Sequence, residues 1–211
     1  MRRTLVVLAT IAVLLSTACG RSRGAGYQAG QASVAATPRE RAIQSAIEQT
    51  EFTHRYDPSY ARIDYPGGDV PLDRGACSDV IVRSFRKAGV DLQKEIHEDM
   101  AANFSSYSNK WGASRPDPNI DHRRVQNLMT YFERKHKSLP ITDKRENYIP
   151  GDVVAWDLGG GLLHIGMVTN AKSWLAGHNQ IVHNIGAGAR LEDVLFSWKI
   201  IGHYRYFDEP V

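Results

Sequence analysis

The hydrophobic period of this 211-residue chain changes between its two halves, and this change constrains the fold most strongly. Up to about residue 137, apolar residues recur at helical spacing. From residue 152 onwards, short β-rich runs are separated by Gly, Asn and Pro, and they predict strands over residues 152–156, 164–168, 180–183 and 200–207. These strands follow one another too closely for helical crossovers. The sequence therefore predicts an antiparallel sheet and an α+β fold.

A helix is predicted between Gly75 and Gly89, with Cys77 at its N-terminal end. Cys77, Ile81 and Ala88 fall on one face of this helix. A cysteine at a helix start meets the positive end of the backbone dipole and unpaired N–H groups, which favour the nucleophilic thiolate. The alternative interpretation is a small buried cysteine that only packs.

The segment before this helix contains a capped helix and then a loop. Thr37, Pro38 and Glu40 form a capping box with proline at the first helical position, which predicts a helix start there. Residues 52–74 are rich in Gly and Pro and are predicted to form a loop. Its tyrosines Tyr56, Tyr60 and Tyr65 either line a cleft or pack on the surface.

A further helix is predicted over residues 119–137, with Asp121 as its cap. His122, Arg123 and Arg124 then fall in its first turn. Two guanidinium groups at a helix start match the planar shape of a substrate carboxylate. A solvated, charged helix end is the alternative.

The first 18 residues are typical of an export signal, with a basic start, an apolar run too short to span a bilayer and small residues at the end. Leu15–Gly20 also resembles a bacterial lipobox, in which cleavage precedes Cys19 and the thiol is acylated. Cleavage after Ala18 without acylation is the alternative. Gly20 after the cysteine favours the outer membrane, by resemblance to Gram-negative lipoproteins. Residues 19–36 are predicted to be a flexible tether and residues 37–211 the folded domain.

Composition excludes several classes of function. Loss of Arg2 and Arg3 with the signal lowers the formal net charge from +3 to +1, which does not suggest nucleic-acid binding. His97, Glu98 and Asp99 are adjacent, so on a helix they point in different directions and cannot share one ion. We expect no metal, no cofactor and a monomer. If Cys19 is acylated, Cys77 is the remaining free thiol in an oxidising compartment.

A thiol nucleophile needs a base, and histidine is the natural one because its unperturbed pKa is near ~6.5. His164 opens a predicted strand directly after Gly159–Gly161, and His183 lies on the next predicted strand. Side chains on neighbouring antiparallel strands can lie side by side on one face. His183 is therefore expected to orient the ring of His164, as the third member of a triad does.

Four segments in order resemble the NlpC-type bacterial cell-wall cysteine peptidases. They are the nucleophile helix Gly75–Val90, the Pro-Gly-Asp strand Pro150–Trp156, the base-bearing strand His164–Val168 and the third-residue strand Ile181–Asn184. The resemblance covers about residues 50–207. Ala76 departs from the family pattern, because aspartate is usual before the cysteine.

A closer resemblance is to a bacterial family filed as domain of unknown function 1287. It is carried by Tyr65–Pro71, Ile120–Leu128, His183–Gly186 and Gly202–Tyr204. This resemblance supports the fold. It carries no substrate with it.

The NlpC-type resemblance implies a papain-like fold, with the nucleophile helix packed on a small antiparallel sheet. It also implies that Cys77 is the nucleophile, His164 the general base and then acid, and His183 the orienting residue, while the backbone N–H of Cys77 contributes to an oxyanion hole. Asn184 is a rival third member. The residues expected to contact substrate are Tyr65, Asp79, His122, Arg123, Arg124 and Asn184.

The function expected from these features is an exported thiol hydrolase that cleaves an amide bond in peptidoglycan stem peptides, held in the cell envelope by a lipid on Cys19. One alternative keeps the fold and transfers the acyl or peptidyl group to an amine or alcohol. The other alternative is a non-catalytic envelope protein that binds cell-wall fragments or a partner.

Overall fold

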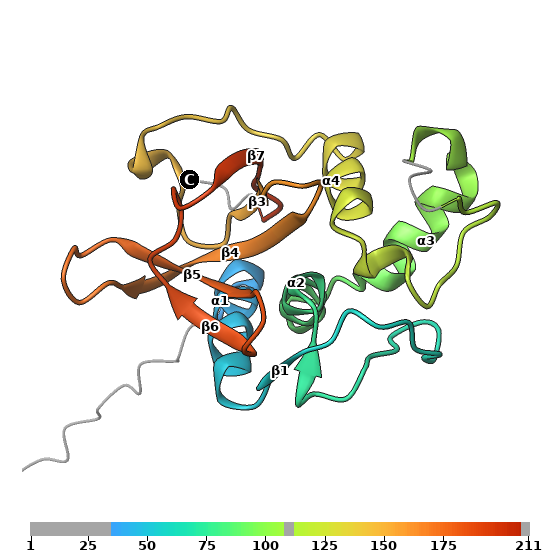
Figure 1. Cartoon of the computed structure of the whole chain (residues 1–211), viewed down its shortest axis with the longest axis horizontal. Helices are drawn as coiled ribbons and strands as arrows, with labels where there is room; N and C mark the ends of the chain where they lie inside the picture. Colours follow the sequence, from blue (N-terminus) through green and yellow to red (C-terminus); the bar gives the residue numbers. More distant parts are fainter. Residues whose placement is uncertain (1–34, 108–111, 208–211) are drawn as a thin grey trace, which may run out of the picture. The chain divides into compact units, whose positions relative to one another are not determined.

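The computed structural model describes residues 35–107 and 112–207 (Figure 1). The predicted export signal (1–18), Cys19 and nearly all of the predicted tether (19–36) lie outside the described residues. No helix in the described part is both long and apolar enough to cross a membrane.

The described residues contain the helices α1 (Pro38–Glu48), α2 (Cys77–Lys87), α3 (Leu92–Ala102) and α4 (Val125–Arg134). The predicted start of α1 is confirmed, because the hydroxyl of Thr37 accepts from the N–H of Glu40 and the carboxylate of Glu40 accepts from the N–H of Thr37. Helix α3 was not predicted. Its cap is Asp91, whose carboxylate accepts from the N–H of Gln93 at 3.1 Å.

The helix predicted over residues 119–137 is shorter than expected. Asp121–Arg123 form a separate 3-10 turn, and Arg124 is extended (φ −101°, ψ 118°), so α4 begins only at Val125. The side chain of Asp121 accepts from the N–H of Asp117 at 2.6 Å and does not cap α4. The prediction that Asp121 caps this helix was therefore wrong, and so was the placement of the His-Arg-Arg segment in its first turn.

The strands β3 (Val153–Asp157), β4 (Leu163–Lys172), β5 (Asn179–Asn184), β6 (Ala189–Glu192) and β7 (Lys199–Tyr204) form one sheet in the order β6-β5-β4-β3-β7. Every neighbouring pair is antiparallel, as predicted. Strand β6 was not predicted. Two short strands, β1 (Arg55–Tyr56) and β2 (Arg74–Gly75), pair in parallel elsewhere. The α+β class is thus confirmed.

Helices α1 and α2 lie against the same face of the sheet, beside β4 (Figure 1). The main core forms between them, and it includes Ile81 and Phe85 of α2 with Ile165 and Met167 of β4. Alternation along β4 turns Val168 towards the other face, where a second apolar cluster forms with Trp156. The expectation that the cysteine helix packs on a small antiparallel sheet is confirmed.

The Pro-Gly-Asp segment before β3 has a structural role. Asp152 is fully buried, and its carboxylate accepts hydrogen bonds from His203 at 2.8 Å and from Arg205 at 2.8 and 2.9 Å. Gly151 has φ +94°, a conformation that favours glycine. These contacts join the start of β3 to the end of β7. Asp152 of the Pro-Gly-Asp segment therefore stabilises the sheet.

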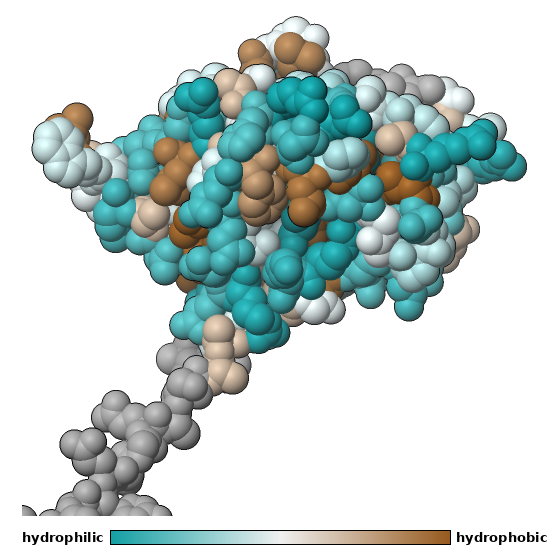
Figure 2. All heavy atoms as spheres, turned by 90° about the horizontal axis from the view of Figure 1, so that it is seen from below, coloured by the Kyte–Doolittle hydropathy of each residue, from teal (hydrophilic) through white to brown (hydrophobic). Residues whose placement is uncertain are grey.

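Hydrophilic side chains cover most of the face seen in Figure 2, and hydrophobic ones show only in small separate areas. Among the described residues, the two most exposed large apolar side chains are Trp174 and Leu175, in the turn between β4 and β5, at 93% and 85% exposure. This hairpin projects from the sheet (Figure 1) and does not pack on the core.

Candidate active site

Cys77 is the first residue of α2, as predicted. The carboxylate of Asp79 accepts from the N–H of Ala76 at 2.6 Å, which satisfies one of the donors that a helix start leaves unpaired. Asn184 of β5 donates from Nδ2 to the carbonyl of Gly75 at 2.8 Å and so braces the same end of the helix against the sheet. The position of the thiol is therefore fixed from two sides.

The thiol of Cys77 is almost fully buried, at 4% exposure. Burial raises its pKa to about 11, although the backbone N–H groups of Ile165, Ser78 and Cys77 itself hydrogen-bond to the sulfur and lower the pKa. The prediction that the helix start favours a thiolate was wrong for the free protein. Desolvation of the charged form outweighs the hydrogen bonds and the helix dipole, so the thiol is protonated at neutral pH.

The two predicted histidines meet. His164 Nε2 lies 2.8 Å from His183 Nδ1, and both rings are buried, at 2% and 1% exposure. Gly166 lies directly opposite His183 in the register, and a Cβ on it would approach the His183 Cβ to 3.1 Å. The glycine thus leaves room for the ring of His183 to reach across to β4. The predicted pairing of these histidines is confirmed.

The chain of hydrogen bonds continues to a residue that the sequence analysis did not select. His183 Nε2 lies 2.9 Å from Oε2 of Glu192 on β6. Burial lowers the pKa of His164 to about 3, with a further lowering from His183. Burial also lowers the pKa of His183, against the opposing effect of Glu192. Both imidazoles are therefore neutral near pH 7.

Two tryptophans enclose the histidine pair. The ring of His164 lies 5.7 Å from that of Trp156 and 5.7 Å from that of Trp198, measured between centroids. The ring of His183 lies 6.0 Å from that of Trp198. This apolar enclosure keeps water from the hydrogen bond between the imidazoles, which strengthens it. Trp198 was also missed by the sequence analysis.

The thiol of Cys77 contacts the backbone of β4 next to His164. Ile165, whose N–H bonds the sulfur of Cys77, is the residue after His164. No hydrogen bond joins Cys77 to His164 within residues 35–107 and 112–207. Because His183 engages Nε2 of His164, Nδ1 is the ring nitrogen left for a thiol proton. The structure thus joins the two histidines directly, whereas the thiol of Cys77 bonds the backbone that follows His164 and not its ring.

A cavity of about 440 Å³ opens beside the thiol. Its lining includes Tyr56, Tyr60, Cys77, Arg124 and Leu163. Two of the loop tyrosines therefore line a cleft, which was one of the two interpretations of the sequence. Partial burial raises the pKa of Tyr56, and the nearby Cys77 and Asp79 raise it further, so its phenol remains a hydrogen-bond donor.

Asp79 and Arg123, both expected to contact substrate, instead form a buried ion pair. Arg123 Nε lies 2.8 Å from Oδ1 of Asp79, and the side chains are 2% and 4% exposed. Arg123 also donates to the carbonyls of Asp57 and Ser59. The guanidinium reaches the cavity lining, yet its donors hold the tyrosine loop to α2. Its function in the fold is structural.

The other residues that were expected to contact substrate lie in different surroundings. Arg124 lines the cavity beside Cys77. Tyr65 does not line it and packs edge-on against His97, with ring centroids 5.2 Å apart. His122 is buried at 2% exposure, burial lowers its pKa to about 4, and its Nδ1 has no hydrogen-bond partner among the described residues. Asn184 does not line the cavity and donates to the carbonyl of Gly75 before α2.

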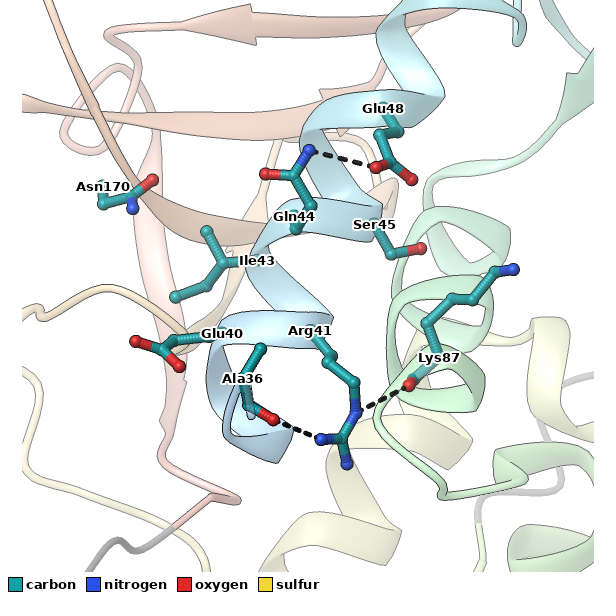
Figure 3. A pocket seen from close by; sticks show the side chains of 9 residues that line it. All are labelled: Ala36, Glu40, Arg41, Ile43, Gln44, Ser45, Glu48, Lys87 and Asn170. Carbon is teal, nitrogen blue, oxygen red and sulfur yellow. Dashed lines mark hydrogen bonds between the residues drawn. The ribbon is translucent and has the colours of Figure 1, made fainter. Parts of the chain in front are cut away.

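A second cavity, of about 490 Å³, lies where α1 meets the end of α2 (Figure 3). Arg41 there donates to the carbonyls of Ala36 and Lys87, and Gln44 donates to Glu48. Its lining contains no cysteine and no histidine. No cluster of metal-ligating side chains occurs in the described part of the chain either.

Comparison with known proteins gives a family and one curated relative. A model of the family described as domain of unknown function (DUF1287) matches residues 43–206. The chain is 53% identical over 162 residues to an uncharacterized protein, YijF, of Escherichia coli (strain K12), and the match covers 77% of this chain and 78% of that protein. No solved structure matches.

Proposed function

The chain belongs to the family of domain of unknown function 1287, and from the geometry around Cys77 we propose that it is a thiol hydrolase acting on an amide bond. The observation that carries this proposal is the hydrogen-bonded chain His164–His183–Glu192, which begins one residue from the group that binds the Cys77 sulfur. A buried histidine pair anchored on a carboxylate is costly to build for structure alone. Beside a thiol at a helix start, it fits the nucleophile, base and orienter arrangement.

In the proposed reaction, the sulfur of Cys77 attacks the substrate carbonyl carbon while the thiol proton passes to Nδ1 of His164. This transfer needs the sulfur and Nδ1 within about 3 Å of each other, which substrate binding must bring about. The oxyanion that forms is held by the N–H groups at the start of α2. The C–N bond then breaks, and the leaving amine takes the proton from Nδ1.

The second half of the proposed reaction releases the acyl group. Water attacks the thioester carbonyl and gives a proton to Nδ1 of His164. The carbon–sulfur bond breaks, and Cys77 recovers its proton. Histidine thus acts first as base, then as acid, in each half, and the protein returns to its starting state. Because the imidazoles are neutral at rest, the base is in the correct form before substrate arrives.

We extend the proposal to fold, substrate and location from the sequence. The four segments that resemble NlpC-type cell-wall peptidases support a papain-like arrangement and a peptide of peptidoglycan as substrate. The export signal and the lipobox around Cys19 support an envelope protein anchored at the outer membrane. A cavity with tyrosines and Arg124 beside the thiol suits a polar peptide that carries a carboxylate.

The test is a digest of purified peptidoglycan with the full chain, followed by mass spectrometry of the soluble fragments. New stem-peptide fragments are expected from the unaltered protein and from Glu48→Ala, an exposed position on α1 that does not line the cavity beside Cys77. Cys77→Ala and His164→Ala should release none. Fragments released equally by Cys77→Ala would refute the proposal. An amine added to the same digest tests transfer, since its mass would then appear on the product.

One observation favours a second candidate, a non-catalytic envelope protein that binds cell-wall fragments. Burial raises the pKa of the Cys77 thiol to about 11, so the free protein holds a protonated thiol beside its cavity. Equilibrium binding of soluble muropeptides would distinguish the two candidates. Binding with recovery of intact muropeptide, unaffected by Cys77→Ala, would support the binding protein over the hydrolase.

A further inference from the structure

The histidine chain ends on a group that can only accept hydrogen bonds. An ionised carboxylate has no donor, so the short contact between Oε2 of Glu192 and Nε2 of His183 requires the proton to lie on that nitrogen. The side chain of Glu192 is 42% exposed and open to water, whereas the histidine it contacts is buried. The direction of this bond is therefore fixed at its exposed end.

The proton on Nε2 of His183 also determines the direction of the hydrogen bond between the two imidazoles. A neutral imidazole carries one proton, so with Nε2 protonated, Nδ1 of His183 is an acceptor. His164 Nε2, at 2.8 Å, must then be the donor of the bond between the rings. With its own proton on Nε2, His164 presents an unprotonated Nδ1. This is the nitrogen that has to accept the proton of Cys77.

We propose that Glu192 is a positioning residue that sets the tautomers of His183 and His164 and leaves Nδ1 of His164 free of a proton. This inference rests on the proposed function for its importance, but the tautomers themselves do not depend on any reaction. The reversed tautomers would turn an imidazole lone pair towards the carboxylate and place a proton on Nδ1 of His164, where it would block transfer from the thiol.

Strand β6 supplies this residue by a short route. Ile181 of β5 pairs with Glu192, two residues along from His183, so the carboxylate lies on the same side of the sheet as the imidazole. The backbone N–H of Ala189, at the start of β6, donates to the carbonyl of Thr53 at 2.8 Å. Strand β6 is therefore held by its pairing with β5 and by the bond from Ala189 to Thr53, and these backbone contacts position Glu192.

The test reads the tautomers directly, by nitrogen-15 NMR of the imidazole rings in the full chain without substrate. Signals are assigned with His164→Gln and His183→Gln. The unaltered protein should show Nε2 protonated and Nδ1 bare in both rings. Glu192→Lys, which replaces an acceptor by a donor, should reverse both assignments, and Glu192→Ala should give a mixture. Glu192→Gln keeps an acceptor oxygen and should retain the native tautomers.

A proton on Nδ1 of His164 in the unaltered protein would overturn the inference, and so would unchanged tautomers in Glu192→Lys. Cleavage assays then separate this inference from the proposed function. We expect Glu192→Ala to lower kcat about 10- to 100-fold with little change in KM, as the loss of a charge-assisted hydrogen bond predicts. Glu192→Gln should recover most of that loss. Native tautomers without any cleavage by the unaltered protein would refute the hydrolase alone.

Discussion

Replacing Asp79 by alanine should lower the free energy of unfolding of the domain by several kcal/mol. The carboxylate is buried against Arg123, with hydrogen bonds of 2.8 and 2.9 Å, and it also accepts from the N–H of Ala76 at 2.6 Å. Removing one partner of a buried ion pair costs about 3–5 kcal/mol, because the other charge stays buried and unpaired. The lost acceptor at the helix start adds about 1 kcal/mol. The expected loss is therefore about 4–6 kcal/mol.

The assay is urea unfolding of the full chain, followed by far-UV circular dichroism. Asp73→Ala is the matched control, because Asp73 pairs with Arg55 on the surface, where both side chains are at least half exposed. Such a pair is worth about 0–1 kcal/mol. A domain of this size has roughly 5–15 kcal/mol of stability in total, so the two variants should differ clearly.

A double substitution tests whether the loss of stability comes from leaving one charge of the ion pair buried and unpaired. Asp79→Leu with Arg123→Met removes both charges and fills the space with apolar groups, which should recover much of the loss. If Asp79 and Arg123 instead bound substrate, as their sequence context suggested, Asp79→Ala would weaken binding and leave stability close to that of Asp73→Ala. That result would refute the structural role given to this pair.

Three further predictions concern the thiol, the base and the sheet. Burial holds the pKa of Cys77 near 11, so alkylation of the Cys77 peptide in the folded chain, followed by mass spectrometry, should keep rising above pH 9; a plateau reached by pH 7 would contradict this. His164 has a pKa of about 3 when folded against 6.5 when unfolded, so the unfolded chain binds the extra proton first and stability falls as pH falls from 6.5 towards 3. His164→Gln should remove about 3 kcal/mol of that acid destabilisation, measured by urea unfolding at pH 7 and pH 4; an unchanged pH slope would count against it. Gly166→Ala places a Cβ 2.8 Å from Ile181 and 3.1 Å from His183, so it should cost about 1–3 kcal/mol by urea unfolding and change the ring NMR signals of His183; neither effect should appear if the strands can separate freely.

The parts of the site that depend on local pattern were predictable from the sequence. The start of α2 at Cys77 follows from helical spacing and from residues within one turn. The pairing of His164 with His183 follows from two strand patterns joined by one hairpin. In both cases the interacting residues lie close together in the sequence, so hydrophobic periodicity and turn residues are enough to predict them.

The parts that depend on distant contacts were not predictable in the same way. Arg123 and Asp79 are 44 residues apart, and nothing in either segment shows that one charge neutralises the other in the core. The thiol pKa depends on how deeply α2 is buried, which a helix start alone does not reveal. Glu192 was within reach, because the glycine-rich residues 185–188 indicate a hairpin after β5, and the antiparallel register then brings β6 beside His183.

Trapping the covalent intermediate on Cys77 would show whether this thiol is the nucleophile. The full chain is mixed with purified peptidoglycan fragments, quenched in acid within the first turnover, digested and examined by mass spectrometry. We expect a peptide containing Cys77 that carries the acyl part of the substrate as a thioester, removable by hydroxylamine and absent from Cys77→Ala. Cleaved substrate with an unmodified Cys77, produced equally by the alanine variant, would contradict the assignment of this thiol as the nucleophile.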